Sequence, residues 1–224
     1  MKKLVVLLSL LVCVPAVAQD ETPVNPLAER NKMLYSLGFL LGDNLKKQLV
    51  LDNEDDYKAV SQGMRDSLLN KTSQTDVDSY KPQIMQKYQD DARLISQKRE
   101  AAQQKYLTNF QKEKGVKVLD NGAMMKLSRA GKGKNPKADS TVTVHYTGTL
   151  IDGTKFDSSR DRGEATSFGL NQVVPCWTKA LQQMKPGARA KVVCPADTAY
   201  GNRPVGPIPP HSVLVFDVEL LDIQ

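Results

Sequence analysis

The spacing of apolar residues changes once along this chain of 224 residues, near Gly115. Before that point, leucines recur every three or four residues, a spacing typical of amphipathic helices. After it, short runs of alternating apolar and polar residues are separated by turn residues, which favours a half-buried antiparallel sheet. The chain is therefore expected to be an α+β protein, with a helical region over residues 19–114 and a sheet-containing domain over residues 115–224.

Residues 1–18 have the pattern of a secretory signal peptide. Lys2 and Lys3 provide a positive start, residues 4–14 form an apolar run, and Ala16–Ala18 matches an A-x-A cleavage site. The run is shorter than the roughly 20 residues of a membrane-spanning helix, which argues against a short anchor. Lipidation at Cys13 is disfavoured, because the residue before it is larger than is usual at such sites. We therefore expect an exported protein without a membrane span, located in the periplasm or, alternatively, at the outer membrane or outside the cell.

Three helices are expected in the helical region. The first carries an apolar stripe of Leu34, Leu37, Leu41, Leu45 and Leu49, with Gly38 and Gly42 between them. Polar residues 52–55 can cap a second helix over Asp55–Leu69, and a third runs from about residue 75 to residue 112, with Pro82 near its beginning. Because it is polar, this third helix is either a solvated spacer or a connection to the following domain. The first two helices are too short to bury their stripes alone, so we expect them to form a homodimer.

Four strands are expected in the second domain, at residues 124–127, 142–146, 191–194 and 213–223. Alternation gives two of these strands a single apolar face. The residues on these faces are Val142, Val144 and Tyr146 in one strand, and Leu214, Phe216, Val218 and Leu220 in the other. A single helix is expected over Trp177–Met184, because a proline precedes it and a Lys-Pro-Gly sequence ends it.

Familiar catalytic and metal-binding patterns are missing from the sequence. His145 and His211 are far apart and lack metal-ligand spacing, and there is no G-x-S-x-G nucleophile motif. The run Gly131–Lys134 lacks the pattern of a phosphate-binding loop. The formal charge of +6 is not organised into a basic stripe with aromatic residues, which argues against nucleic acid as a partner. We therefore expect no metal and no cofactor.

Two cysteines, Cys176 and Cys194, follow the predicted signal peptide. An exported protein meets an oxidising compartment, so a disulfide between them is the favoured interpretation. The alternative is a pair of buried thiols that pack as small apolar side chains.

The second domain also combines apolar and aromatic residues with a few polar ones. They are Tyr146, Phe156, Asp157, Val173, Val174, Trp177, Tyr200, Ile208 and Phe216. A pocket for a small ligand or a peptide needs such a combination, with a few polar groups converging on an apolar hollow. The alternative is that these side chains are ordinary core residues.

Five segments of this domain resemble the FKBP-type peptidyl-prolyl cis–trans isomerases and occur in that family's order. They are VHYTG (Val144–Gly148), FDSSRDRGE (Phe156–Glu164), NQVVPCW (Asn171–Trp177), AYG (Ala199–Gly201) and PIPPHSVLVFDVELLDI (Pro207–Ile223). The run YSLGFLLGDNL (Tyr35–Leu45), with the leader and the helices, is similar to the dimerising N-terminal part of exported bacterial members, including the macrophage-infectivity-potentiator type.

The resemblance implies a strongly curved antiparallel sheet wrapped around one short helix, with a pocket between them. By motif position, Trp177 would form the pocket floor, and the walls would be Tyr146, Phe156, Val173, Ile208 and Phe216. The backbone N–H of Val174 and the hydroxyl of Tyr200 would bind ligand carbonyls. Asp157 would lie beside the reacting amide, with Arg162 holding it. Asp157, Tyr200, Trp177 and Phe156 are thus the expected catalytic residues, and the others are expected to bind substrate.

The implied activity is rotation of X–Pro bonds in unfolded or exported polypeptides, without a covalent step. A non-catalytic dimeric holdase chaperone is the alternative, and chaperone action is also expected alongside isomerase activity. The chain departs from the family's pattern where Ala165–Thr166, Gln172 and Cys176 replace a wall residue, an acidic residue and a glycine. These departures bear on the outer part of the pocket and on binding of macrocyclic inhibitors, which the resemblance implies as ligands, rather than on the reaction.

Overall fold

The computed structural model describes residues 26–224. The predicted signal peptide, with Cys13, therefore lies outside the described residues. The chain divides into two compact units between Lys81 and Pro82, which are described separately below. No helix within residues 26–224 combines the length and the apolar character needed to cross a membrane.

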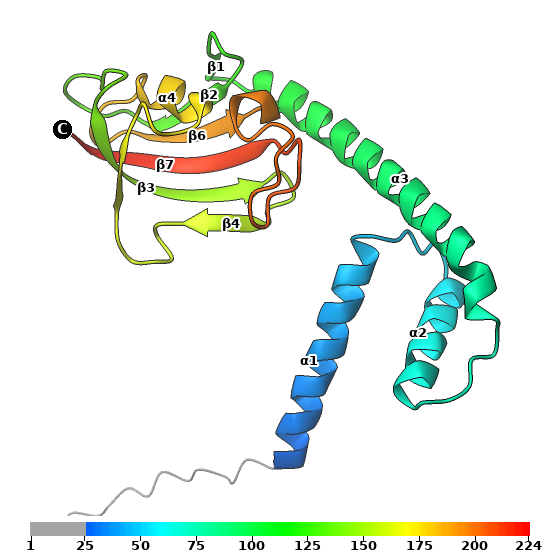
Figure 1. Cartoon of the computed structure of the whole chain (residues 1–224). Coiled ribbons are helices and arrows are strands. Elements are labelled where there is room, and N and C mark those ends of the chain that lie inside the picture. The colour runs from blue at the N-terminus through cyan, green and yellow to red at the C-terminus, as the bar shows by residue number, and fades with distance from the viewer. Residues whose placement is uncertain (1–25) are drawn as a thin grey trace, which may run out of the picture. The chain divides into compact units, whose positions relative to one another are not determined.

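The first unit contains α1 (Pro26–Lys46), α2 (Glu54–Leu68) and the first residues of α3 (Val77–Gln111) (Figure 1). Asn53 caps α2, because its side-chain oxygen accepts hydrogen bonds from the backbone N–H groups of Asp55 and Asp56 at 2.9 and 3.0 Å. The three predicted helices are thus present, with small shifts at their ends. Leu49, which we assigned to the first stripe, lies beyond the end of α1.

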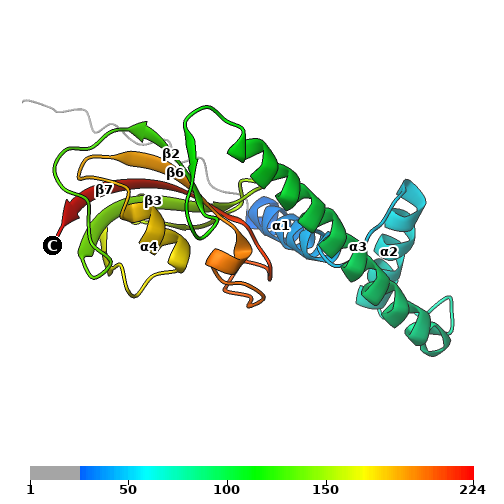
Figure 2. The same ribbon diagram turned by 90° about the horizontal axis from the view of Figure 1, so that it is seen from above.

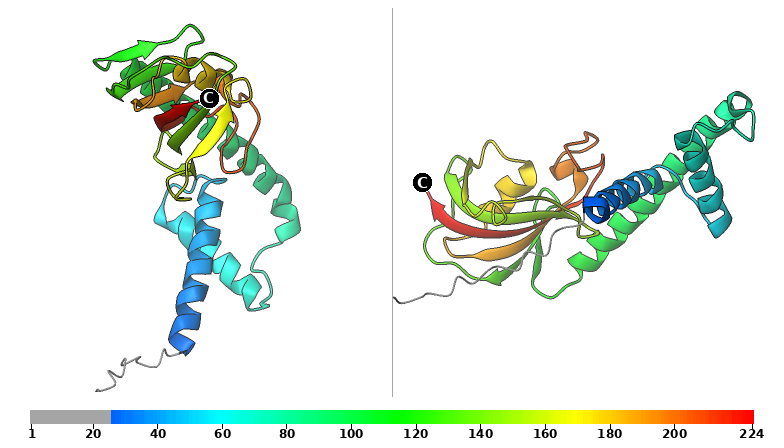
Figure 3. Two further views of the ribbon diagram at one scale, coloured as in Figure 1. Left: turned by 90° about the vertical axis from the view of Figure 1, so that its left-hand side faces the viewer. Right: turned by 90° about the horizontal axis from the view of Figure 1, so that it is seen from below.

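The second unit contains the rest of α3 and an antiparallel sheet of seven strands (Figures 1 and 3). The strands are β1 (Val116–Val118), β2 (Met124–Arg129), β3 (Thr141–Leu150), β4 (Lys155–Ser158), β5 (Thr166–Gly169), β6 (Arg189–Cys194) and β7 (Leu214–Ile223). Their order is β1-β2-β6-β7-β3-β4, and β5 also pairs with β3. The four predicted strands are present, but β1, β4 and β5 were missed because three or four residues are too few to show alternation.

The inner face of the sheet packs against α4 (Pro175–Leu181) (Figures 1 and 2). As alternation predicted, the apolar faces of β3 and β7 are buried in this core, where they contact Trp177 and Leu181 of the helix. The predicted extent of this helix, residues 177–184, was wrong at both ends. It begins at Pro175, because proline lacks the N–H that has no partner in a first helical turn. It ends at Leu181, ahead of the Lys-Pro-Gly sequence.

The outer face of the sheet is partly covered by the last turns of α3. Phe110, which is 2% exposed, packs with Val193 of β6 and Val215 of β7. The side-chain oxygen of Gln103 accepts a hydrogen bond from the backbone N–H of Val213. The C-terminal end of α3 is therefore packed against the sheet. At this end the helix is a connection to the following domain rather than a solvated spacer.

A disulfide bond joins Cys176 in α4 to Cys194 at the end of β6. Their Cα atoms are 5.6 Å apart, and both side chains are fully buried. The bond links the helix to the sheet close to the start of η1 (Ala196–Thr198), a short turn of 3₁₀ helix.

Candidate active site

A cavity of about 480 Å³ opens between α4 and the inner face of the sheet. Nine of the ten residues expected to bind or transform a substrate line it: Tyr146, Phe156, Asp157, Val173, Val174, Trp177, Tyr200, Ile208 and Phe216. The tenth, Arg162, lies outside the lining and contacts Asp157. The cavity thus gathers residues from α4, four strands and the segment after β6, which are up to 70 positions apart in sequence (146 to 216).

The floor of the cavity is an aromatic cluster centred on Trp177. The indole ring is 5% exposed and meets the rings of Tyr146, Phe168 and Phe216 edge to face, with centroids 5.2, 5.6 and 5.2 Å apart. Such contacts favour one ring orientation over others. The indole Nε1 is buried without a hydrogen-bond partner among the described residues. The floor is therefore an aromatic surface whose central ring is enclosed by three others.

The walls depend on Gly148, the last residue of the VHYTG motif, which was not among the expected site residues. Phe156 and Phe216 meet edge to face, with their ring centroids 5.6 Å apart. A Cβ atom on Gly148 would lie 2.5 Å from Cε2 of Phe156 and 3.0 Å from Cε1 of Phe216. A residue with a side chain would therefore displace one of the two rings, and with it a wall of the cavity.

One carboxylate is held at the edge of this apolar cavity. The hydroxyl of Tyr146 donates to Oδ2 of Asp157, and Nη1 of Arg162 donates to Oδ1 of the same carboxylate. A second guanidinium nitrogen of Arg162 donates to the Tyr146 hydroxyl at 3.2 Å and to the Thr166 hydroxyl at 3.4 Å. Thr166, one of the departures from the family's pattern, thus supports Arg162 beside the cavity.

The surroundings of this carboxylate keep it ionised. Burial by itself would raise the pKa of Asp157, but hydrogen bonds from Tyr146 and Arg162 outweigh burial and lower the pKa below its ordinary value of 3.8. Burial, and then the hydrogen bond to Asp157, raises the pKa of the Tyr146 hydroxyl above its ordinary value of 10.0. At neutral pH, Asp157 is therefore an anion that accepts from a neutral phenol and a cationic guanidinium.

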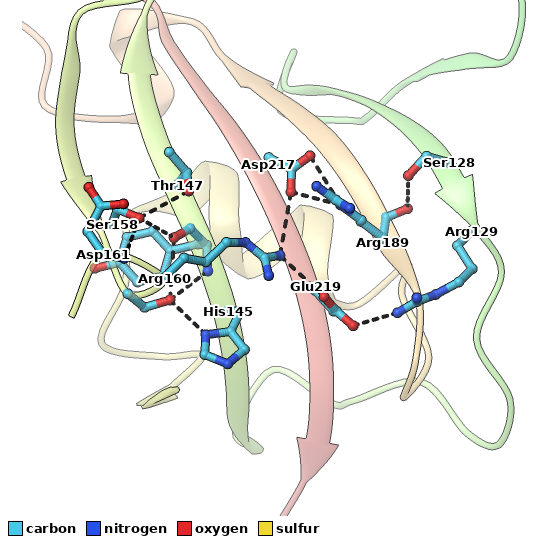
Figure 4. Close-up of polar contacts among 12 residues, drawn as sticks. Ser128, Arg129, His145, Thr147, Ser158, Arg160, Asp161, Arg189, Asp217 and Glu219 are labelled. Carbon is cyan, nitrogen blue, oxygen red and sulfur yellow. Dashed lines mark hydrogen bonds and ion pairs between the residues drawn. The ribbon is translucent and has the colours of Figure 1, made fainter. Parts of the chain in front are cut away.

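Hydrogen bonds and an ion pair connect the residues between Asp157 and Arg162 to strands β3 and β7 (Figure 4). The Ser159 hydroxyl accepts a hydrogen bond from the backbone N–H of Tyr146 at 2.8 Å and lies 3.2 Å from Nδ1 of His145. Nη2 of Arg160 lies 3.3 Å from a carboxylate oxygen of Glu219. These contacts tie the segment that carries Asp157 and Arg162 to β3 and β7.

Two further groups face the cavity with unused hydrogen-bonding capacity. Tyr200 is half-buried on the segment after η1, and its hydroxyl makes no hydrogen bond with any part of the chain that the structure describes. Val174 precedes the first residue of α4, and its backbone N–H likewise finds no acceptor within residues 26–224. Both groups are therefore available to a ligand's carbonyl oxygens.

Four lining residues were not expected: Phe168, Val205, Gly206 and Pro207. Gln172, which we had noted as a departure, also lines the cavity. Pro207 begins the recognised motif Pro207–Ile223, and Val205 and Gly206 directly precede it, so their position was a usable signal. Phe168 lies in β5, whose brevity concealed it.

The lining of the cavity is suited to holding a ligand by apolar packing and hydrogen bonds. Within residues 26–224, no group of three or more His, Cys, Asp or Glu side chains could hold a metal ion. The cavity instead offers an apolar floor, one anion and two free hydrogen-bonding groups. Such a cavity suits a small apolar ring that is flanked by peptide bonds.

Comparisons with known proteins agree with this arrangement. Residues 132–221 match the family model described as FKBP-type peptidyl-prolyl cis-trans isomerase. Residues 30–126 match the domain that lies amino-terminal to such isomerases. Together the two models cover nearly all of the part of the chain that the structure describes.

Individual relatives are similar over most of their length. The chain is 39% identical over 203 residues to the FKBP-type peptidyl-prolyl cis-trans isomerase FkpA of Escherichia coli, covering 86% of this chain and 75% of that protein. It is 36% identical to the outer membrane protein MIP of Legionella longbeachae, covering 92% and 90% of the two chains. The crystal structure of Escherichia coli FkpA matches with a TM-score of 0.60 at 37% identity, over 90% of this chain and 98% of that one.

Proposed function

The chain belongs to the FKBP-type peptidyl-prolyl cis–trans isomerases, and we propose that the cavity above Trp177 is its active site. The observation that carries this proposal is a single apolar cavity that brings together an aromatic floor, an ionised carboxylate and two free hydrogen-bonding groups. Family membership makes the protein an isomerase and not a purely non-catalytic holdase.

The reaction needs only a surface that binds the twisted amide better than the planar one. Rotation about an X–Pro bond has a barrier of about 18–20 kcal/mol, because the C–N bond has partial double-bond character. Twisting breaks this resonance and reduces the charge on the carbonyl oxygen. An apolar cavity therefore stabilises the twisted amide relative to the planar amide, and no covalent intermediate is required.

Each residue then has a distinct role. The prolyl ring would pack on Trp177, between the walls formed by Phe156 and Phe216. The Tyr200 hydroxyl and the Val174 N–H would hold carbonyl groups of the flanking peptide. Asp157 would lie beside the rotating amide, fixed by Tyr146 and Arg162.

Peptide binding can be followed by the fluorescence of Trp177, which is the only tryptophan in the chain. A tetrapeptide with an X–Pro bond is expected to change the emission in a saturable way. Replacing its proline by alanine removes about two methylene groups from the apolar floor, which should weaken binding roughly tenfold or more. Equal affinity for the two peptides, or no change in emission with either, would contradict the proposed floor.

We also propose that α1 and α2 form a homodimer. The apolar side chains of α1 are largely exposed in the single chain: Met33, Leu34, Tyr35, Leu37, Phe39, Leu40 and Leu41. A groove of about 800 Å³ between α1 and α2 is lined by Leu45, Val60, Met64 and other, mainly apolar residues. An apolar surface of this kind is usually covered by another protein surface, and a second copy of the same helices offers a matching one.

The dimer can be tested with the variant Leu37→Asp/Leu41→Asp. These side chains are 52% and 48% exposed in the single chain, so the change should spare the monomer while placing charges in the interface. Light scattering after gel filtration should give the mass of a monomer, and tetrapeptide isomerisation should stay within about twofold of wild type, because the cavity lies in the other unit. Ser36→Asp, on the polar side of α1 near Lys32, is the control and should remain a dimer. A dimeric double variant would exclude this interface.

Chaperone action would accompany isomerisation through the dimer. Two cavities on one dimer can bind one unfolded polypeptide at two points, which raises the effective concentration for the second contact. The monomeric variant should therefore suppress aggregation of an unfolded protein less well while keeping peptide isomerisation.

Export is the setting that the sequence and the relatives support. Residues 1–18 carry a signal-peptide pattern, and one relative bears the name of an outer membrane protein. We propose the periplasm as the location and unfolded, proline-containing exported proteins as the substrates.

A further inference from the structure

The disulfide lies between the two chain segments that carry the free hydrogen-bonding groups of the cavity. Cys176 is in the first turn of α4, two residues after Val174. Cys194 is the last residue of β6, and the chain continues from it through η1 to Tyr200. The bond therefore joins the segment of the Val174 N–H to the segment of the Tyr200 hydroxyl.

Hydrogen bonds and ion pairs do not connect these two segments to each other in the part of the chain that the structure describes. Within residues 26–224, no hydrogen bond or ion pair joins residues 171–177 to residues 194–201. The bonds around η1 stay on their own side, as when the Thr198 hydroxyl donates to the Pro195 carbonyl at 2.8 Å. On the other side, Thr178 donates to the Leu170 carbonyl at 2.7 Å. Apart from apolar packing, the disulfide is thus the direct link between the two segments in the described structure.

A small movement of α4 against the η1 segment would change the distance between the two groups. A peptide held at two carbonyls binds well only when both partners are already at the right separation. Apolar packing permits sliding more readily than a covalent bond does. We propose that the Cys176–Cys194 disulfide is a positioning cross-link that holds the Val174 N–H and the Tyr200 hydroxyl at the separation needed by the substrate. This proposal rests on the roles assigned above to Val174 and Tyr200.

The test compares removal of the cross-link with and without the Tyr200 hydroxyl. Wild type, checked by intact mass for absence of free thiols, is compared with Cys176→Ala/Cys194→Ala, with Tyr200→Phe and with the triple variant. In the tetrapeptide assay, the cross-link variant should raise KM about tenfold and leave kcat within about twofold, because the flanking contacts are equally present in ground and transition states. In the Tyr200→Phe background, the same removal should raise KM less than about threefold, because one of the positioned groups is already gone.

Two controls separate positioning from loss of stability. Val142→Ala removes core volume in β3 at a residue that does not line the cavity, so it should lower the melting temperature and leave KM unchanged. If the alanine pair does not fold, Cys176→Ala/Cys194→Val restores part of the lost volume, and circular dichroism and Trp177 emission verify its folding.

Each result decides the proposal. An unchanged KM after removal of the cross-link, or an equal rise in KM with and without the Tyr200 hydroxyl, would overturn it and leave the disulfide with a purely structural role. Should Tyr200→Phe with an intact disulfide leave KM unchanged, the assigned role of Tyr200 itself fails, and the positioning proposal fails with it. Failure of the role assigned to Tyr200 is therefore recognised from Tyr200→Phe alone, without any change to the cysteines.

Discussion

Asp157→Ala is expected to lower kcat/KM for an X–Pro tetrapeptide by about 10- to 100-fold. The carboxylate accepts hydrogen bonds from Tyr146 and Arg162, and hydrogen bonds to charged groups contribute about 1.5–3 kcal/mol each. Without it, the Arg162 guanidinium is left beside the cavity without its counter-charge. The rotating amide then faces an unbalanced positive charge in place of an ion pair, and the Tyr146 hydroxyl loses its acceptor. A loss of about 1.4 kcal/mol in the transition state already corresponds to a tenfold slower reaction.

The matched control is Asp161→Ala in the same loop. Asp161 pairs with Lys155 at the surface, and an exposed ion pair contributes little to stability or geometry. This variant should keep kcat/KM within about twofold of wild type. Equal losses for Asp157→Ala and Asp161→Ala would show that the loop as a whole, and not the carboxylate at position 157, supports the reaction.

The low pKa of Asp157 predicts how kcat/KM depends on pH on the acid side of neutrality. Because the pKa of Asp157 is held below its ordinary value of 3.8, the group is ionised throughout the range above about pH 5. Its ionisation should therefore leave kcat/KM flat between about pH 5 and 8. Its contribution to folding stability is complete above the ordinary pKa and is lost as the pH falls through the lower folded pKa. The profile should be measured in an assay that uses no coupling protease, because the protease has a pH dependence of its own. A fall in kcat/KM that begins near neutral pH and is also seen in Asp157→Asn would have to come from another group.

Phe110→Ala is expected to destabilise the second unit by about 3–5 kcal/mol, the usual cost of removing a buried phenylalanine. Phe110 is 2% exposed and packs on Val193 and Val215 across the outer face of the sheet. Those two residues are neighbours of Val192 and Phe216, which belong to the core on the inner face. Urea unfolding followed by Trp177 emission reports on this unit directly. The control Leu94→Ala, at a position of α3 that is 38% exposed, should cost less than about 1 kcal/mol.

The packing of α3 on the sheet also predicts which N-terminal truncations of the second unit remain stable. A chain that begins at Ser96 keeps Gln103 and Phe110, whereas a chain that begins at Glu113 exposes their partners on the sheet. We therefore expect the longer fragment to be as stable as the intact second unit and the shorter one to lose stability by an amount similar to that of Phe110→Ala. Equal stability of the two fragments would show that the end of α3 contributes nothing to this unit. The domain boundary near residue 115 remains a prediction until this comparison is made.

Local features of the sequence were sufficient to locate the long elements. Spacing of leucines in α1 and alternation in β3 and β7 are properties of consecutive residues, so they are visible without a structure. The proline at position 175 likewise marks the start of α4, although pattern alone placed that start two residues late. Nine of the residues expected at the site line the cavity, and all nine occur in or directly beside contiguous motifs such as FDSSRDRGE.

The sequence by itself thus determined the order of the long helices and strands, the apolar faces of β3 and β7, and, through contiguous motifs, nine of the residues that line the cavity. Tertiary structure alone decided that Phe110 covers Val215, that Gly148 makes room for two aromatic rings, and that the Tyr146 hydroxyl joins the Asp157–Arg162 pair. The physical reason is separation along the chain. An outward-facing valine in a strand has the same sequence pattern whether solvent or a helix 105 positions earlier (110 to 215) covers it. Only the folded chain brings the two together.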